Sequence, residues 1–292
     1  MNFRTDLAIE RQEYREKETL DGVLSSTETV EGIKVTTIEI INEQGERLIG
    51  KPAGKYITLE TDKLYKSSEA FSSASQVLCS ELRRLLPERG TVLVAGLGNE
   101  DITPDALGPK SLDLLLATRH ISGEFADSLG LGELRSVAGI VPGVLGKTGI
   151  ETVEIIGGVV KRISPSCVIV IDALASRNTE RLGTTVQLCD TGVSPGSGVG
   201  NRRKGINSET LGVPVIAVGV PTVVDALTMA ADVFEKAGVD LPDMDFSEHR
   251  QMMVTPKEID SLIDKAAHLI AMGINTALQK NLTAAEIAEI VS

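Results

Sequence analysis

The sequence predicts an α/β protein: a doubly wound, mostly parallel sheet flanked by helices. Three short, continuously apolar runs predict its buried strands, at residues 91–95 (TVLVA), 167–171 (CVIVI) and 213–218 (VPVIAV). Segments with helical spacing lie between them, which is the chain order of a parallel sheet covered on both faces. A composition of 42% hydrophobic and 24% charged residues over 292 residues is typical of a globular chain with a sizeable core.

Further helices and a small β-rich extension complete the expected architecture. Apolar residues three and four positions apart predict a helix over residues 67–86, which Pro87 stops. The alternation in residues 33–41 (IKVTTIEII) predicts a strand, and Gln44-Gly45 predicts a turn after it. The remaining helices are expected at residues 111–118, 152–163, 222–236 and 257–278.

The composition excludes several classes of function. The 41 acidic residues outnumber the 29 basic ones, giving a net charge of −12, and phosphate backbones repel such a chain. Aromatic residues make up only 3% and include no Trp, which disfavours base stacking. The longest uncharged apolar stretch, residues 210–224, contains two prolines and is shorter than the ~20 residues of a membrane span. We therefore expect neither nucleic acid nor a membrane as a partner.

The cysteines and the N-terminus favour a cytoplasmic protein. The three cysteines form no CxxC pair, which excludes a disulfide framework or a cysteine-rich zinc site. No signal peptide opens the chain, because Arg4, Asp6 and Glu10 interrupt any apolar region. On composition alone, the highly charged first 20 residues predict a solvated terminal arm.

Two aspartates stand where chemistry gathers in a doubly wound sheet. Asp105 follows the strand at 91–95 and Asp172 follows the strand at 167–171, so both are expected near the carboxyl ends of neighbouring strands. Two carboxyl groups in one crevice drive their pKa values apart, so that one holds a proton while the other acts as a base. The same pair could begin a divalent-metal site, and each residue alone could simply cap a helix.

Three glycine-containing patterns resemble known motifs, but each has a residue that is incompatible with the mechanism of that motif. Asp101 stands where the third glycine of GxGxxG should approach a pyrophosphate, so the charge has the wrong sign for a dinucleotide site. Val141 stands where the P-loop ending at Thr148 needs its first glycine. Residues 192–196 match GxSxG, but Pro195 has no N–H to donate to an oxyanion.

A basic, glycine-rich segment interrupts the acidic chain at residues 196–205 (GSGVGNRRKG). Its composition suits a flexible surface loop. The functional alternative is a lid or a clamp for an acidic polypeptide substrate, in which Arg202, Arg203 and Lys204 would contact the substrate.

Several segments together resemble the germination protease family of endospore-forming bacteria. The resemblance runs through nearly the whole chain and is carried by residues 4–10 (RTDLAIE), 96–109 (GLGNEDITPDALGP), 170–177 (VIDALASR), 201–226 and 253–260. It implies an endopeptidase that degrades small acid-soluble, DNA-protecting proteins in the spore during germination. It further implies the fold of hydrogenase-maturation proteases, and a homotetramer in the cytoplasm of the developing spore.

The resemblance also implies the site. The two essential aspartates of the family correspond to Asp105 and Asp172, the pair already singled out by strand-end position. One would activate water and the other would protonate the substrate, and the order stays open because interacting carboxyl groups titrate as a pair. Gly98 and Asn99 are expected to supply oxyanion donors or to support the aspartates.

The resemblance further implies an inactive zymogen that removes its own short N-terminal leader. The match at RTDLAIE predicts cleavage between Asp6 and Leu7, so residues 1–6 form the leader and residues 7–292 a single α/β peptidase domain. Leaders in the family are typically longer than these six residues. A segment that resembles a cleavable sequence could occupy the crevice until it is cut.

Two other functions remain open from the sequence. No cofactor is expected, but a metal-dependent peptidase could use the same aspartates as ligands. A non-catalytic oligomer could instead bind acidic spore proteins through the basic loop at residues 202–204.

Overall fold

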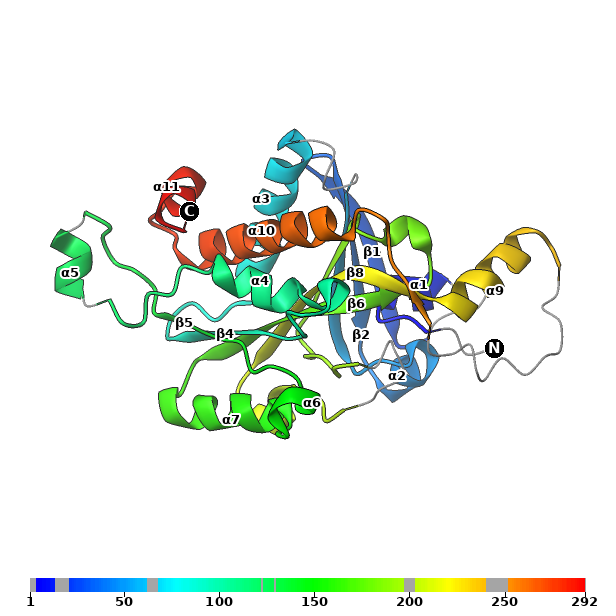
Figure 1. Ribbon diagram of the computed structural model, residues 1–292, viewed down its shortest axis with the longest axis horizontal. Coiled ribbons are helices and arrows are strands. Elements are labelled where there is room, and N and C mark those ends of the chain that lie inside the picture. Colours follow the sequence, from blue (N-terminus) through cyan, green and yellow to red (C-terminus); the bar gives the residue numbers. More distant parts are fainter. Residues whose placement is uncertain are drawn as a thin grey trace.

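A computed structural model of the chain describes residues 4–13, 21–61, 68–121, 123–128, 130–196, 203–239 and 252–291. Its centre is one mixed sheet with the strand order β1-β2-β3-β7-β8-β6-β4-β5, to which β9 adds beside β8. Helices cover both faces of this sheet, so the predicted α/β class is confirmed (Figure 1).

The parallel half of the sheet contains the three predicted strands. It consists of β4 (Val92–Gly96), β5 (Val137–Ile140), β6 (Cys167–Ser176) and β8 (Val215–Asp225). These strands pair in parallel, and β4, β6 and β8 are almost entirely buried, as their continuous apolar runs predict. Strand β6 is longer than expected, and this extension places Asp172 within the strand rather than after it.

The antiparallel half is the predicted β-rich extension. Three consecutive strands, β1 (Val23–Val30), β2 (Ile33–Ile40) and β3 (Gly54–Glu60), lead into β7 (Thr185–Cys189), which pairs antiparallel to β8. The short strand β9 (Met253–Val254) pairs with the end of β8. Strand β7 therefore joins the extension to the parallel half, next to the centre of the sheet.

One face of the sheet packs against α3 (Ser68–Leu85), α4 (Leu107–Asp113) and α10 (Ile259–Leu278). The other face packs against α7 (Thr152–Ile163) at the parallel end and against α1 (Ala8–Glu13) at the antiparallel end. Figure 1 shows α4 and α10 above the sheet and α7 below it. The apolar cluster around α1 has Leu7 and Ala8 at 0% exposure, so the expectation of a solvated arm is wrong for these residues.

The remaining elements connect or extend these layers. They are η1 (Thr103–Asp105), α2 (Glu43–Ile49), α5 (Gly123–Ser128), α6 (Leu145–Thr148), η2 (Thr179–Arg181), α8 (Ser208–Leu211), α9 (Ala226–Lys236) and α11 (Ala284–Val291). The predicted turn at Gln44-Gly45 is wrong: Asn42 accepts a hydrogen bond from the N–H of Gly45 and caps α2 instead. Among the described residues, no helix is both long and apolar enough to cross a membrane.

Candidate active site

Asp172 lies in β6 on the sheet face that carries α1 and α7. Its neighbours on that face are Val170 and Leu174, which belong to two different apolar clusters. Gly219 of β8 pairs with Asp172 on one side and with Gln187 of β7 on the other. Since paired residues in a sheet point to the same face, Asp172 and Gln187 share a row in which Gly219 contributes no side chain. Asp172 is only 9% exposed.

Asp105 is brought to the same place by the glycine-rich turn after β4. The N–H of Asn99 donates to Oδ2 of Asp105 at 2.8 Å, so Asn99 holds this carboxyl group through its main chain. Gly98 has φ of +110°, and a Cβ there would lie 1.9 Å from the carbonyl oxygen of Asp105. Only glycine allows this approach of the turn to the catalytic candidate. Both expected support residues, Gly98 and Asn99, therefore contact Asp105.

The two carboxyl groups have different surroundings. Burial raises the pKa of Asp172 well above its usual range, and the charges of Asp105 and Asp6 raise it further, against the N–H of Ala173. Burial also raises the pKa of Asp105, but the N–H of Asn99 and the charge of Arg203 oppose this rise. Asp172 is thus the better holder of a proton, and Asp105 the better holder of a negative charge.

The Asp6–Leu7 bond lies beside this pair. Strand β4 ends its pairing with β6 at Ile171, so that edge of β6 is open toward Ser176. Asp6 occupies the open edge: its N–H donates to the carbonyl of Ala175 at 2.8 Å, and its Oδ2 accepts the N–H of Ala175 at 2.9 Å. Leu7 then turns into the apolar cluster around α1 with 0% exposure. The predicted processing bond therefore passes across the site.

Lys51 adds a positive charge next to the side chain of Asp6. Burial lowers the pKa of Lys51, and the negative charge of Asp6 opposes this lowering. The Lys51 ammonium lies 5.7 Å from the centre of the Tyr56 ring. No pattern in the sequence singled out Lys51, because Asp6, whose charge acts on it, comes from a distant segment.

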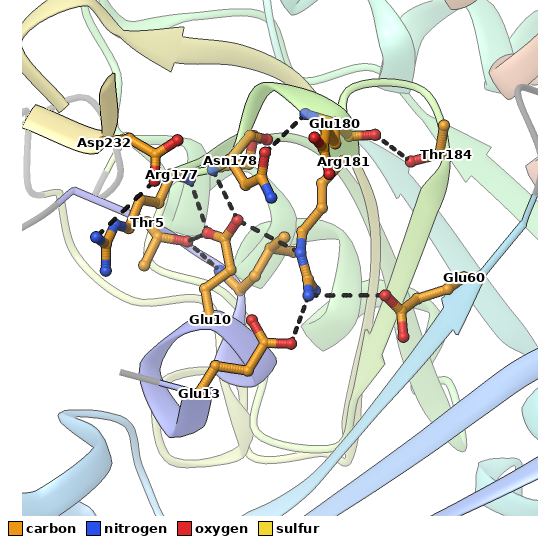
Figure 2. Close-up of polar contacts among 12 residues, drawn as sticks. Thr5, Glu10, Glu13, Glu60, Arg177, Asn178, Glu180, Arg181, Thr184 and Asp232 are labelled. Atoms are coloured by element: carbon orange, nitrogen blue, oxygen red, sulfur yellow. Dashed lines mark hydrogen bonds and ion pairs between the residues drawn. The ribbon is translucent and has the colours of Figure 1, made fainter. Parts of the chain in front are cut away.

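A buried ion network fixes α1 on the far side of the same bond (Figure 2). Glu10 accepts the N–H groups of Arg177 at 2.7 Å and of Asn178 at 2.9 Å, and the hydroxyl of Thr5 donates to it. Arg181 lies 3.6 Å from Glu10 and donates to Glu13 at 2.7 Å. These contacts join α1 to the segment that follows β6. Sequence reasoning missed them because Glu10 looked like one charge among many in a charged arm.

Among the described residues of the basic loop, Arg203 reaches the site. Arg203 is half-buried, and its charge acts on Asp105. Lys204 is exposed, and Arg202 lies outside the described residues. The structure therefore places Arg203 at the aspartate pair.

The charges of Asp6 and Asp105 both act on Asp172, and the carboxylate oxygens of these residues are the possible metal ligands nearest the site. Within the described parts of the chain, no group of three or more His, Cys, Asp or Glu side chains is arranged to hold a metal ion. Oxygen ligands of this kind would suit a hard divalent cation.

An α/β sheet that holds two carboxyl groups of unequal acidity against an extended segment of its own chain defines a polypeptide-binding site of the kind a peptidase requires. Comparison with known proteins agrees with this class. The family model described as germination protease matches residues 4–237 and 247–290. The chain belongs to the germination protease family, and it is a peptidase.

Several curated relatives carry the same description over almost their full length. The germination protease of Caldanaerobacter subterraneus is 46% identical over 322 aligned positions, which cover 100% of this chain and 98% of the relative. Those of Clostridium perfringens and Bacillus pumilus are 44% and 39% identical, covering 98% and 96% of this chain and 98% and 94% of the relatives. Among solved structures, a NiFe-hydrogenase maturation protease from Thermococcus kodakarensis matches with a TM-score of 0.37 at 15% identity, covering 66% of this chain and 98% of that one.

Proposed function

We propose that the chain is an endopeptidase that begins the degradation of small acid-soluble, DNA-protecting spore proteins at germination. We further propose that it is made as a zymogen, which cleaves its own chain between Asp6 and Leu7. The observation that carries the proposal is the position of that bond. Asp6 adds to the open edge of β6 next to Asp172, in the way that an extended substrate adds to a sheet edge.

The surroundings of the aspartates support a division of labour. Asp105 is the base: the N–H of Asn99 and the charge of Arg203 favour its ionised form. Asp172 is the acid, because burial and two neighbouring carboxylates favour its protonated form. Asp105 takes a proton from water, whose oxygen bonds to the carbonyl carbon of Asp6. Asp172 gives its proton to the nitrogen of Leu7 as the carbon–nitrogen bond breaks.

The zymogen is inhibited because its own leader occupies the site. Asp6 occupies the β6 edge that another chain would need, and Arg4 holds the leader in place through Asp225 at 3.3 Å. Cleavage converts the leader into a separate peptide, which can leave. Because Glu10 and its hydrogen bonds with Arg177 and Asn178 lie beyond the cut, α1 can stay docked when the leader leaves the edge of β6.

The leader also indicates which substrates fit. The carboxylate of Asp6 is bound by the N–H of Ala175 and faces the charge of Lys51, while Leu7 enters an apolar pocket. We therefore expect cleavage after an acidic residue and before a large apolar one. Arg203 at the crevice favours acidic substrate segments.

We propose from the family resemblance that the active form is a homotetramer in the cytoplasm of the spore. Apolar side chains on α9, with Val233 61% exposed and Phe234 36% exposed, support contact between copies. Sedimentation equilibrium should give four times the chain mass, and a monomer would remove this part of the proposal.

The experiment is a timed incubation with a small acid-soluble spore protein, with and without chelator. It compares the full-length chain, the chain that starts at Leu7, and the Asp172→Asn variant of the latter. We expect fast cleavage by the Leu7 form, slow cleavage by the full-length form and none by the variant, with chelator making no difference. Loss of activity on chelation would instead assign the aspartates to a metal, and binding without cleavage would identify a non-catalytic binder.

A further inference from the structure

The residue that contacts both sides of the Asp6–Leu7 bond is Gln187 of β7. Its Nε2 donates to the carbonyl oxygen of Asp6 at 3.1 Å, and its Oε1 accepts the N–H of Ala8 at 2.8 Å. The first of these atoms belongs to the bond that is to be cut, and the second lies one residue beyond it. A single side-chain amide therefore contacts the chain on both sides of the Asp6–Leu7 bond.

The orientation of this amide is fixed by its partners. A main-chain carbonyl can only accept and a main-chain N–H can only donate, so rotating the Gln187 amide would break both hydrogen bonds at once. Gln187 is 6% exposed, so water has little access to replace either contact. The donor is thus already directed at the carbonyl oxygen, with no reorganisation needed.

The row in the sheet explains why Gln187 reaches this bond. Asp172 and Gln187 both pair with Gly219, so they stand two strand spacings apart, or about 10 Å, on the same face. Only glycine fits between them, since a Cβ at Gly219 would lie 2.6 Å from the carbonyl oxygen of Asp172 and 2.7 Å from Leu174. Asp6 is hydrogen-bonded to Ala175 of β6 and, through its carbonyl, to Gln187 of β7, so the segment spans the distance between these two strands.

We propose that Gln187 is a further catalytic residue, which polarises the carbonyl of the bond being cut and stabilises the oxyanion that forms when water adds. This inference rests on the proposed self-cleavage. Gln187 transfers no proton: it donates a hydrogen bond that strengthens as negative charge collects on the Asp6 oxygen. Its Oε1 meanwhile fixes the chain after the bond and sets the register of the cut.

No sequence motif announces this role. Gln187 is the one amide in the strand TVQLC, whose other residues are apolar or Thr. A polar side chain at such a position is expected to satisfy a core contact. Here its partners belong to the chain segment that the site processes.

The test measures the first-order rate of leader loss in the full-length chain, by intact mass, for wild type, Gln187→Met and Gln187→Glu. Loss of one preorganised oxyanion donor slows catalysis by about 10²-fold or more, and we expect this for Gln187→Met at every pH. Glu keeps the acceptor for Ala8 but donates only when protonated. The ratio of its rate to that of wild type should therefore rise as the pH falls, whereas the ratio for Met should stay flat.

Gln279 provides the matched control. It is a 2% exposed glutamine whose amide likewise binds main chain, accepting from the N–H of Arg135 at 2.9 Å and donating to its carbonyl at 3.0 Å. Gln279→Met removes an equivalent buried amide far from the site, so it should lower the melting temperature without changing the rate of self-cleavage.

The outcomes separate the two proposals. Self-cleavage of Gln187→Met at the wild-type rate, or equal slowing by Gln279→Met, overturns the role of Gln187 and leaves the proposed function intact. Failure of the wild type to cleave itself under any condition overturns the proposed function, and the role of Gln187 with it.

Discussion

The two sides of the Asp6–Leu7 bond are held in different ways. On the leader side, Asp6 is hydrogen-bonded to Ala175 at an open strand edge, and Arg4, with a 28% exposed side chain, pairs with Asp225. On the α1 side, Leu7 and Ala8 are 0% exposed, and Glu10 enters a buried network with Arg181. One side is bound like a peptide, and the other is packed like a core.

This difference explains how one short segment can be both the substrate of the site and a part of the folded core. Contacts at an open edge can be released after a cut, because the covalent bond is what keeps the leader at high effective concentration. Thr5 of the leader donates to Glu10, but the apolar burial of Leu7 and Ala8 and the contact of Glu10 with Arg181 lie beyond the cut, so α1 can stay docked. A bond at the boundary between the two is the one whose cleavage frees one side and preserves the other.

The largest expected effect is the loss of all cleavage when either aspartate is neutralised. Asp105→Asn removes the base and Asp172→Asn removes the acid, so each should slow self-processing by at least about 10³-fold. Time courses of leader loss and circular dichroism would check rate and fold together. Full activity in either variant would contradict the assigned mechanism.

We expect substitutions on the α1 side of the bond to lower the free energy of unfolding. Glu10→Ala leaves Arg181 buried without its deepest partner, and breaking a buried pair costs about 3–5 kcal/mol of unfolding free energy. Glu13, whose side chain is 44% exposed, provides the control, and Glu13→Ala should cost at most about 1 kcal/mol. Urea unfolding of both variants measures the difference; equal costs would show that the network does not anchor α1.

We expect the buried Asp172 to lower the stability of the fold at neutral pH. The folded chain holds its proton more tightly than the unfolded chain, so its stabilising contribution is present at acidic pH and is lost as the pH rises toward its raised pKa. Asp172→Asn is neutral throughout, and at pH 7 its melting temperature should exceed that of wild type by at least about 2 °C. The gap should close below about pH 4, near the usual pKa of Asp. A lower melting temperature at pH 7 would argue against a strained, buried carboxyl group.

We also expect Asp6 of the leader to affect the pKa of Asp172. The charge of Asp6 raises the pKa of Asp172, so Asp6→Asn should lower that pKa while leaving an acceptor for the N–H of Ala175. The alkaline limb of the self-cleavage profile, which requires protonated Asp172, should then move to lower pH. The profile of first-order rate against pH measures this, and an unmoved alkaline limb would separate Asp6 from the acid.

The smallest effect is expected at Arg203. Its charge lowers the pKa of Asp105, so Arg203→Gln should raise that pKa and move the acidic limb of kcat/KM to higher pH. Lys204→Gln, at an exposed neighbour, is the control and should leave the limb in place. The chain starting at Leu7 with an added substrate is the form to assay.

The parallel half of the fold was predictable because strands that are buried on both faces have continuous apolar sequences, as in β4, β6 and β8. The helix α2 was missed because Gln44-Gly45 resembles a turn, while the deciding contact is a cap from Asn42. The role of α1 was hidden because Arg177 and Asn178, whose N–H groups donate to Glu10, lie more than 160 residues away along the chain.

The candidate site was predictable in part for the same reason. Asp105 and Asp172 were singled out by their position at strand ends, and the structure brings them together. Gln187 and Lys51 gave no signal, because their significance depends on pairing across β8 and on a leader that folds back from the N-terminus. Such placements arise from tertiary contacts rather than from local spacing.

The central claim is that each chain holds its own Asp6–Leu7 bond in its own site. The most direct measurement is N-terminal sequencing of the matured chain, together with the rate of leader loss over a hundredfold range of protein concentration, about the range that separates one-chain from two-chain kinetics. The account predicts a product that begins at Leu7 and a first-order rate constant that does not change with dilution. A different N-terminus, or a rate that falls in proportion to concentration, would contradict it.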